Sequence, residues 1–274
     1  TLIAGNGNNV TLIGGNGGNT LTGGNGVNTI TGGSGNDIIV GGLAADIISA
    51  GGGNDTVTFD TIDASEDGGS GVDTLILIGN SSITASLGNT SNQVTGSTVV
   101  TGFENLDGSA VTASLSLTGD AGANTLVGGS GNDTIIGSGG ADSLYGNGGD
   151  DSITYHAAAN IMDGGTGNNT LVLSQTVATI VDLTNPTNII AGGGAAINFE
   201  TIDGSGSTAA LTITGDANAN VLKGGSGDDV INGGAAADTI SAGGGNDNVI
   251  YDAGDVSIDG GLGVDALILS GTTS

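Results

Sequence analysis

The sequence predicts an all-β solenoid, in which short strands stack coil upon coil. Three observations lead to this prediction. A nonapeptide of the form G-G-x-G-x-D-x-U-x, where U is a large aliphatic residue, recurs along the chain. Glycine supplies 58 of the 274 residues, whereas aromatic residues make up only 2%. Finally, a longer unit of 96 residues repeats above the nonapeptide.

The clearest run of nonapeptides extends from Gly32 to Thr58 and reads GGSGNDIIV, GGLAADIIS, AGGGNDTVT. Glycine enters turn geometry with positive φ without a steric penalty, and it leaves the neighbouring carbonyl oxygens accessible. The acidic position adds an anionic oxygen in each repeat. The last three residues alternate outward, inward, outward, as in a short strand, with an aliphatic residue at the inward place. Each repeat therefore reads as a turn followed by a strand.

This pattern resembles the repeats-in-toxin (RTX) nonapeptide. The resemblance implies that six residues form a calcium-binding turn and three form a strand. It also implies that two successive nonapeptides make one coil of a right-handed parallel β-roll or β-helix. Several Ca²⁺ ions are the expected cofactors, because calcium prefers six to eight oxygen ligands and the turns offer carboxylates and bare carbonyls.

Sixteen nonapeptides are recognisable, and the inward position is Leu, Ile or Val in all of them. We expect these inward residues to be buried: Leu21, Ile30, Ile39, Ile48, Val57, Leu75, Leu126, Ile135, Leu144, Ile153, Leu171, Leu222, Ile231, Ile240, Val249 and Leu267. The predicted metal ligands are Asp37, Asp46, Asp55, Asp73, Asp133, Asp142, Asp151, Asp229, Asp238, Asp247 and Asp265, with the backbone carbonyls of Gly32, Gly35, Gly53, Gly128, Gly131, Gly224 and Gly227.

Asparagine replaces aspartate at the ligand position of five turns, at Asn19, Asn28, Asn124, Asn169 and Asn220. Its amide oxygen is neutral, so we expect these turns to bind calcium more weakly. Alternatively, the asparagines stack in a column that needs no metal. Asp67, Asp163 and Asp259, each just before a Gly-Gly pair, are candidates for auxiliary ligands.

The formal net charge is −27; Lys223 is the only lysine, and the sequence has no arginine. This charge argues against nucleic-acid binding, which needs cations at the phosphates, and against an anionic membrane surface. No apolar run approaches the roughly 18 residues of a membrane-spanning helix, so no membrane insertion is expected. There is no cysteine, which excludes disulfides and thiolate metal sites. The charge itself calls for bound cations.

The 96-residue period takes Gly32–Asp37 to Gly128–Asp133 and then to Gly224–Asp229. We therefore predict one continuous solenoid made of three units, 1–101, 102–197 and 198–274, the last one shorter. Between the nonapeptide runs lie two stretches without the motif, Leu77–Thr101 and Val181–Ser205. They are expected to form larger, metal-free turns or a small excursion from the roll.

One aliphatic side chain per nine residues buries little apolar surface, whereas ordering nine glycine-rich residues costs much conformational entropy. Metal ligands that assemble only in the folded chain turn binding energy into folding energy. We therefore predict that the chain is a disordered polyanion without calcium.

No distinctive catalytic set is present, so the chain is not expected to be an enzyme. His156 has no second histidine or cysteine to complete a metal or catalytic site. Phe59, Tyr155 and Tyr251 fall at equivalent positions and are expected to pack at a repeat seam rather than to stack on sugars. Lys223 alone could serve as the base of a lyase, but surface exposure is the expected state. An ice-binding threonine row is interrupted at the residues that follow the acidic position.

The predicted function is that of an extracellular calcium-binding structural protein, part of a bacterial surface layer, filament or large adhesin, whose roll folds and assembles on Ca²⁺ binding. The family resemblance implies type I secretion and a place at the cell surface. Expected partners are calcium and further repeats or copies of the chain joined end to end. The alternative is an RTX folding and export module of a secreted enzyme or toxin whose active domain lies outside these residues.

Overall fold

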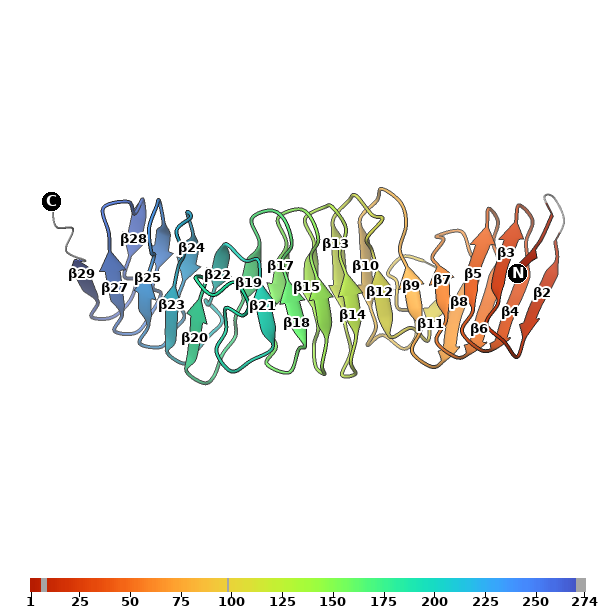
Figure 1. Ribbon diagram of the computed structural model, residues 1–274, viewed down its shortest axis with the longest axis horizontal. Coiled ribbons are helices and arrows are strands. Elements are labelled where there is room, and N and C mark those ends of the chain that lie inside the picture. Colours follow the sequence, from red (N-terminus) through yellow and green to blue (C-terminus); the bar gives the residue numbers. More distant parts are fainter. Residues whose placement is uncertain (6–8, 98, 270–274) are drawn as a thin grey trace. The chain divides into compact units, whose positions relative to one another are not determined.

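The computed structural model describes residues 1–5, 9–97 and 99–269 (Figure 1). It divides into two compact units, Thr1–Ser143 and Leu144–Ser274, and each is described by itself. All the regular secondary structure of the described residues is β-strand, which confirms the all-β prediction. No helix in this part of the chain has the length and apolar character needed to cross a bilayer.

The first unit contains fifteen complete strands. They are β1 (Leu2–Ile3), β2 (Thr11–Gly15), β3 (Thr20–Gly24), β4 (Thr29–Ser34), β5 (Ile38–Gly42), β6 (Ile47–Gly52), β7 (Thr56–Thr58), β8 (Ser65–Ser70), β9 (Thr74–Ile76), β10 (Ile83–Ser86), β11 (Val99–Thr101), β12 (Asn105–Asp107), β13 (Leu115–Thr118), β14 (Thr125–Val127) and β15 (Thr134–Ile136). Strand β16 (Ser143–Tyr145) begins at the last residue of this unit.

The strands of the first unit form parallel sheets in which neighbours lie one coil apart in the sequence. One sheet has the order β1-β3-β5-β7-β9-β12-β14, a second β2-β4-β6-β8-β11 and a third β10-β13-β15. In the first sheet Leu21 pairs with Ile39, and in the second Ile30 pairs with Ile48. This register confirms that two nonapeptides make one coil of a parallel β-solenoid.

The second unit has the same construction. Its strands are β17 (Ser152–Thr154), β18 (Ile161–Asp163), β19 (Thr170–Val172), β20 (Thr179–Asp182), β21 (Ala195–Ile197), β22 (Thr201–Asp203), β23 (Leu211–Thr214), β24 (Val221–Lys223), β25 (Val230–Asn232), β26 (Thr239–Ser241), β27 (Asn248–Tyr251), β28 (Ser257–Asp259) and β29 (Ala266–Leu269). They follow the orders β17-β19-β22-β24-β26-β28, β20-β23-β25-β27-β29 and β18-β21.

The core is a stack of mostly aliphatic side chains to which most strands contribute one; in β8 the inward residue is Glu66, and β1 and β29 bury none. The inward residues predicted from the nonapeptides are buried, with one exception. Leu267 is 56% exposed, so the prediction that it is buried is wrong. The physical reason is that β29 pairs with β27 on one side and, within the described residues, no strand covers its other side.

The two stretches without the motif add strands to the sheets and also make the expected small excursion from the roll. In the first unit, β10 and β11 join the sheets, and the chain between them folds back through an antiparallel bridge between Ala85 and Val94. Buried Gln93 fixes this excursion, because its Nε2 donates to the Phe103 carbonyl at 2.8 Å and its Oε1 accepts the Phe103 N–H at 3.0 Å. The second unit has the equivalent bridge between Val181 and Ile190.

Strand bounds recur with the 96-residue period, as in β12 (Asn105–Asp107) and β22 (Thr201–Asp203). This recurrence extends the sequence repeat to the local structure. The boundaries of the three predicted units, at 101/102 and 197/198, stay a prediction.

Candidate metal-binding turns

The aspartates of the turns lie inside the roll, just before each strand. Ten of the eleven predicted ligands are buried: Asp37, Asp46, Asp55, Asp73, Asp133, Asp142, Asp151, Asp229, Asp238 and Asp247. Asp265 is exposed, in the same last coil that leaves Leu267 uncovered. Each acid stands two residues before the buried aliphatic residue of its strand. Because side chains alternate along a strand, the acid points to the same inner side as that aliphatic residue.

One oxygen of each carboxylate joins successive coils. The N–H of Asn19 donates to Asp37 Oδ1 at 2.7 Å, the N–H of Asp37 to Asp55 Oδ1 at 2.8 Å, and the N–H of Asp55 to Asp73 Oδ1 at 2.7 Å. We call Asn19, Asp37, Asp55 and Asp73 the first column. The second column consists of Asn28 and Asp46, where the Asn28 N–H donates to Asp46 Oδ1 at 2.6 Å.

The second unit continues this bonding pattern. The N–H of Asn220 donates to Asp238 Oδ1 at 2.8 Å, and the N–H of Asp229 donates to Asp247 Oδ1 at 2.7 Å. Each acid therefore satisfies a backbone donor of the coil before it. This use of one oxygen leaves the other oxygen to be explained.

The other oxygen, Oδ2, has no hydrogen-bond donor among the described residues in six of these aspartates: Asp37, Asp46, Asp55, Asp73, Asp238 and Asp247. Leaving an anionic oxygen buried without a partner is costly. Burial, opposed by the backbone hydrogen bond from Asp55, raises the pKa of Asp73 to about 6. Burial likewise raises the pKa of Asp55 and of Asp247. A row of such oxygens fits a cation.

Backbone carbonyls complete the arrangement. A Cβ added at Gly32, the first glycine of its turn, would clash with both Asp37 Oδ2 and the Ala50 carbonyl oxygen of the next coil. The same pair of oxygens, one carboxylate and one carbonyl of the next coil, flanks Gly146 and Gly224. The first glycine is therefore required because its missing side chain leaves room for two converging oxygens.

The donor set favours calcium over a transition metal. No group of three or more His, Cys, Asp or Glu side chains is placed to hold a metal within the described residues. A bound ion would take one or two carboxylates and fill its remaining positions with backbone carbonyls and water. Calcium accepts such all-oxygen sets, whereas zinc and copper sites use nitrogen and sulfur ligands.

Asp133 and Asp229 differ from the other aspartates because both of their oxygens accept protein N–H groups. Asp133 Oδ1 accepts from Leu115 at 2.7 Å and Oδ2 from Gly129 at 2.6 Å. Asp229 has the same two bonds, from Leu211 and Gly225, each at 2.7 Å. These two turns match the motif as fully as Gly32–Asp37 does, yet they leave no carboxylate oxygen without a donor.

The asparagine turns place a donor where the acidic turns have the second oxygen. Asn124 Nδ2 donates to the Glu104 carbonyl at 2.7 Å, and Asn220 Nδ2 to the Glu200 carbonyl at 3.2 Å. Asn28 Nδ2 donates to Asp46 Oδ1 at 3.1 Å. Asn19 and Asn169 make similar amide contacts, with Asp37 and the Asn198 carbonyl. These turns satisfy their own polar groups without a cation.

Sequence reasoning missed two glutamates that end the columns. Glu104 Oε2 accepts the N–H of Asp73 at 2.8 Å, and Glu200 Oε2 accepts the N–H of Asn169 at 2.7 Å. Burial raises the pKa of both. The signal that could have found them is the recurrence of Phe103-Glu104 as Phe199-Glu200 within the stretches that lack the motif.

The three candidate auxiliary ligands accept hydrogen bonds from protein groups. Asp67 Oδ1 accepts from Thr101 Oγ1 at 3.2 Å, whereas Asp163 and Asp259 accept the N–H of Gly165 and Gly261, both at 3.0 Å. Lys223 forms an ion pair with Asp203 at 3.1 Å, and the lysine side chain is 46% exposed. These contacts fit the expectation that Lys223 is a surface residue.

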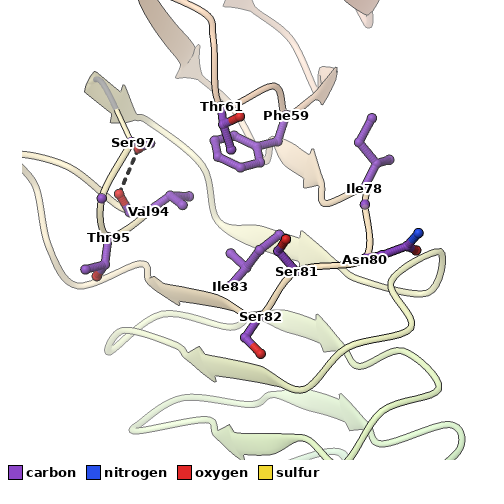
Figure 2. A pocket seen from close by; sticks show the side chains of 12 residues that line it. Phe59, Thr61, Ile78, Asn80, Ser81, Ser82, Ile83, Val94, Thr95 and Ser97 are labelled. Carbon is purple, nitrogen blue, oxygen red and sulfur yellow. Dashed lines mark hydrogen bonds between the residues drawn. The ribbon is translucent and has the colours of Figure 1, made fainter.

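A pocket of about 250 Å³ lies beside the excursion of the first unit, as Figure 2 shows. Its wall includes Phe59, Ile83 and Val94 together with Thr and Ser side chains, and none of its lining residues is charged. In the second unit Tyr155 lies at the position 96 residues after Phe59, and a Cβ at Gly193 would clash with its hydroxyl. Phe59 and Tyr155 are buried, as expected for packing residues.

Comparison with known families agrees with these observations. The family model of the RTX calcium-binding nonapeptide repeat, which describes four copies, matches residues 1–30, 13–48, 22–57, 118–153, 156–172 and 214–249. No curated protein matches the chain. The matched segments together cover more than half of the chain and contain most of the turns described above, but not those of Asp73 and Asp265. The chain therefore belongs to the RTX family of calcium-binding nonapeptide-repeat proteins, built as a parallel β-solenoid.

Proposed function

We propose that this chain is an extracellular structural protein whose roll folds and assembles on binding Ca²⁺, as part of a bacterial surface layer, filament or large adhesin. The observation that carries this proposal is the set of buried Oδ2 atoms without a donor in the described residues, such as Asp37 Oδ2, which converges with the Ala50 carbonyl of the next coil at Gly32. Calcium-binding repeats that make up more than half of the chain suit a structural role.

The ions would bind between coils of the roll. An aspartate from one turn and a carbonyl from the next coil converge at the first glycine, so one ion contacts residues 13 or more positions apart in the chain. Because those oxygens meet only in the folded chain, binding energy is folding energy. We propose the aspartates with a free second oxygen as ligands and the asparagine turns as weak or metal-free turns.

The net charge of −27 explains why an ion is needed. Stacking the turns brings carboxylates of successive coils into contact with the same backbone, and like charges at such positions repel one another. Each bound Ca²⁺ would cancel two of these charges. The calcium-free chain is therefore expected to be expanded and unstructured.

Circular dichroism during a calcium titration tests this proposal. The strand signal should be absent after dialysis against chelator and should rise with Ca²⁺, while Mg²⁺ at the same concentration should be far less effective because it dehydrates reluctantly. A full strand signal in the calcium-free chain at pH 7 would contradict calcium-coupled folding.

Assembly is tested separately by electron microscopy of the folded chain in calcium. Ordered sheets or fibres are expected for a surface-layer or filament protein. Single particles at high protein concentration would instead favour the alternative, a folding and export module of a secreted enzyme or toxin. That module would use the same calcium turns, so the titration does not separate the two functions.

A further inference from the structure

The row Phe59–Asp67 of the first unit lacks the nonapeptide motif, yet it supplies an acid to the second column. The N–H of Asp46 donates to Asp63 Oδ1 at 3.0 Å, as the N–H of Asn28 donates to Asp46 Oδ1. Asp63 is 17 residues after Asp46 rather than 18, which is why the motif does not reveal it. Both aspartates are fully buried.

Asp63 changes the donor set at the first glycine of this turn. The position of a Cβ on Gly41 lies 2.9 Å from Asp46 Oδ2 and 2.8 Å from Asp63 Oδ2. At Gly32, Gly146 and Gly224 the second oxygen at this place belongs to a backbone carbonyl of the next coil. The Gly41 turn therefore presents two converging carboxylates where other turns present one.

One further atom next to this point lacks the donor that a purely structural carboxylate would have. Asp46 Oδ2 is buried and has no hydrogen-bond donor in the described residues, although its Oδ1 has one. Glu66 is 1% exposed, its Oε1 accepts the Asp60 N–H at 2.9 Å, and its carboxyl shares a hydrogen bond with Asp63.

Packing alone does not require these acids. In β8, Glu66 takes an inward place in register with Ile48 of β6 and Val100 of β11. The residues 96 positions after Asp63 and Glu66 are Ala159 and Met162, and Met162 is buried in an ordinary apolar place. The first unit thus has two buried acidic side chains at positions where the second unit has Ala159 and Met162.

We propose that Asp46 and Asp63 together bind one divalent cation, calcium, at a two-carboxylate site that lies outside the nonapeptide motif. The ion would sit against Gly41, with backbone carbonyls and water as its other ligands, and Glu66 would lie behind Asp63 without touching the metal. Affinity of oxygen sites rises with the number of charged ligands, so this is the tightest site of the first unit.

This inference rests on the proposed calcium-dependent folding, and a calcium-binding measurement on the full chain separates the two. The number of bound ions and their affinities are measured by equilibrium dialysis with radioactive calcium for the wild type, D46N, D63N and the double variant D46N/D63N. Asparagine is tolerated in this column, as Asn28 shows, and circular dichroism at saturating calcium checks that each variant folds.

The expected result is that D46N and D63N each weaken the tightest ion by roughly 10- to 100-fold, the range seen when the environment of a metal ligand is altered. The double variant should lose that same single ion, because both carboxylates serve it. E66Q should keep the full number of ions.

Two outcomes would overturn the inference. D63N with an unchanged number and affinity of ions would show that Asp63 binds none. A double variant that loses two ions would show that Asp46 and Asp63 serve separate sites. A wild type that binds no calcium at all would instead defeat the proposed function.

Discussion

The hexapeptide GGSGND occurs twice in the first unit and adopts two different turns. In Gly32–Asp37 the second and fourth residues, Gly33 and Gly35, have positive φ values of 121° and 139°. In Gly128–Asp133 neither equivalent glycine has a positive φ. The carboxylate differs as well, because Asp37 Oδ2 has no donor in the described residues whereas Asp133 Oδ2 accepts a backbone N–H.

The coil underneath explains the difference. Gly33 stacks against Gly15 of another nonapeptide turn, which also has a positive φ, of 108°. Gly129 stacks against Val111, whose carbonyl accepts the Ser130 N–H at 3.0 Å. A β-branched residue strongly disfavours positive φ, so the coil at Val111 does not copy the nonapeptide turn and the turn above it follows a different path. The same hexapeptide therefore leaves its second carboxylate oxygen without a donor above one coil and gives it a donor above the other.

The largest expected effect concerns five buried carboxylates at once, those of Asp46, Asp55, Asp73, Asp238 and Asp247. Burial raises the folded-state pKa of each, that of Asp73 to about 6, so the calcium-free folded chain binds protons more tightly than the unfolded chain. The free energy of unfolding of the calcium-free roll should then be highest at low pH and should fall as the pH rises through these raised pKa values. Lowering the pH from 7 to 5 without calcium should increase the strand signal in circular dichroism.

The same acidification gives the opposite result in calcium, because a carboxylate must lose its proton to bind the ion. Calcium affinity should fall between pH 7 and 5. If the strand content of the calcium-free chain decreased on acidification over this range, the folded chain would not contain buried carboxylates that lack a hydrogen-bond donor.

A smaller effect separates the two turns directly. D37N removes an anionic oxygen that has no protein donor, so it should weaken calcium binding by roughly 10- to 100-fold at one site. D133N is the matched control at the same letter of the same hexapeptide, and the number of bound ions should not change in it. Isothermal titration calorimetry measures the number and the affinity of the ions in both variants. Loss of one ion in D133N as well would show that the two turns bind calcium alike.

D133N should instead lower stability whatever the calcium concentration. Asp133 accepts two N–H groups, and an asparagine would turn its NH₂ towards one of them. Leaving a buried donor unsatisfied costs about 1–3 kcal/mol. Thermal unfolding of D133N at several calcium concentrations should show a constant loss relative to the wild type. A loss that disappears in high calcium would point to a metal ligand.

The smallest expected effect concerns alanine at the fourth place of a turn. Ala236 has a positive φ of 82°, which costs an L-residue about 1–2 kcal/mol. A236G should raise the free energy of unfolding in calcium by about 1 kcal/mol, as measured by chemical denaturation. Ala44 holds the same place in GGLAAD without a positive φ, so A44G should lower stability slightly. A gain in both variants would show that the turn conformation is not what distinguishes them.

Much of the candidate site could be predicted from the sequence, because the nine-residue period places each acid and each aliphatic residue independently of the rest of the fold. Asp37 and Ile39 are two residues apart, so both lie inward whenever the strand forms. The pairing of Leu21 with Ile39 follows from two repeats to a coil. Asp63, Glu104 and Glu200 could not be predicted, since they lie 17 or 31 residues after the residue whose N–H they accept, whereas the motif spacing is 18.

The sequence by itself determined the all-β class, the strand positions, the coil length and the family, because these depend on local glycine conformation and on side-chain alternation. Only the tertiary structure decided which carboxylates keep an oxygen free. That outcome depends on the coil stacked against each turn, as at Val111, and coil neighbours are separated by 17 to 35 residues in the chain. The path that those neighbours impose on a turn settles whether an N–H of the same turn reaches the second carboxylate oxygen, as Gly129 does at Asp133, or leaves that oxygen available to a cation.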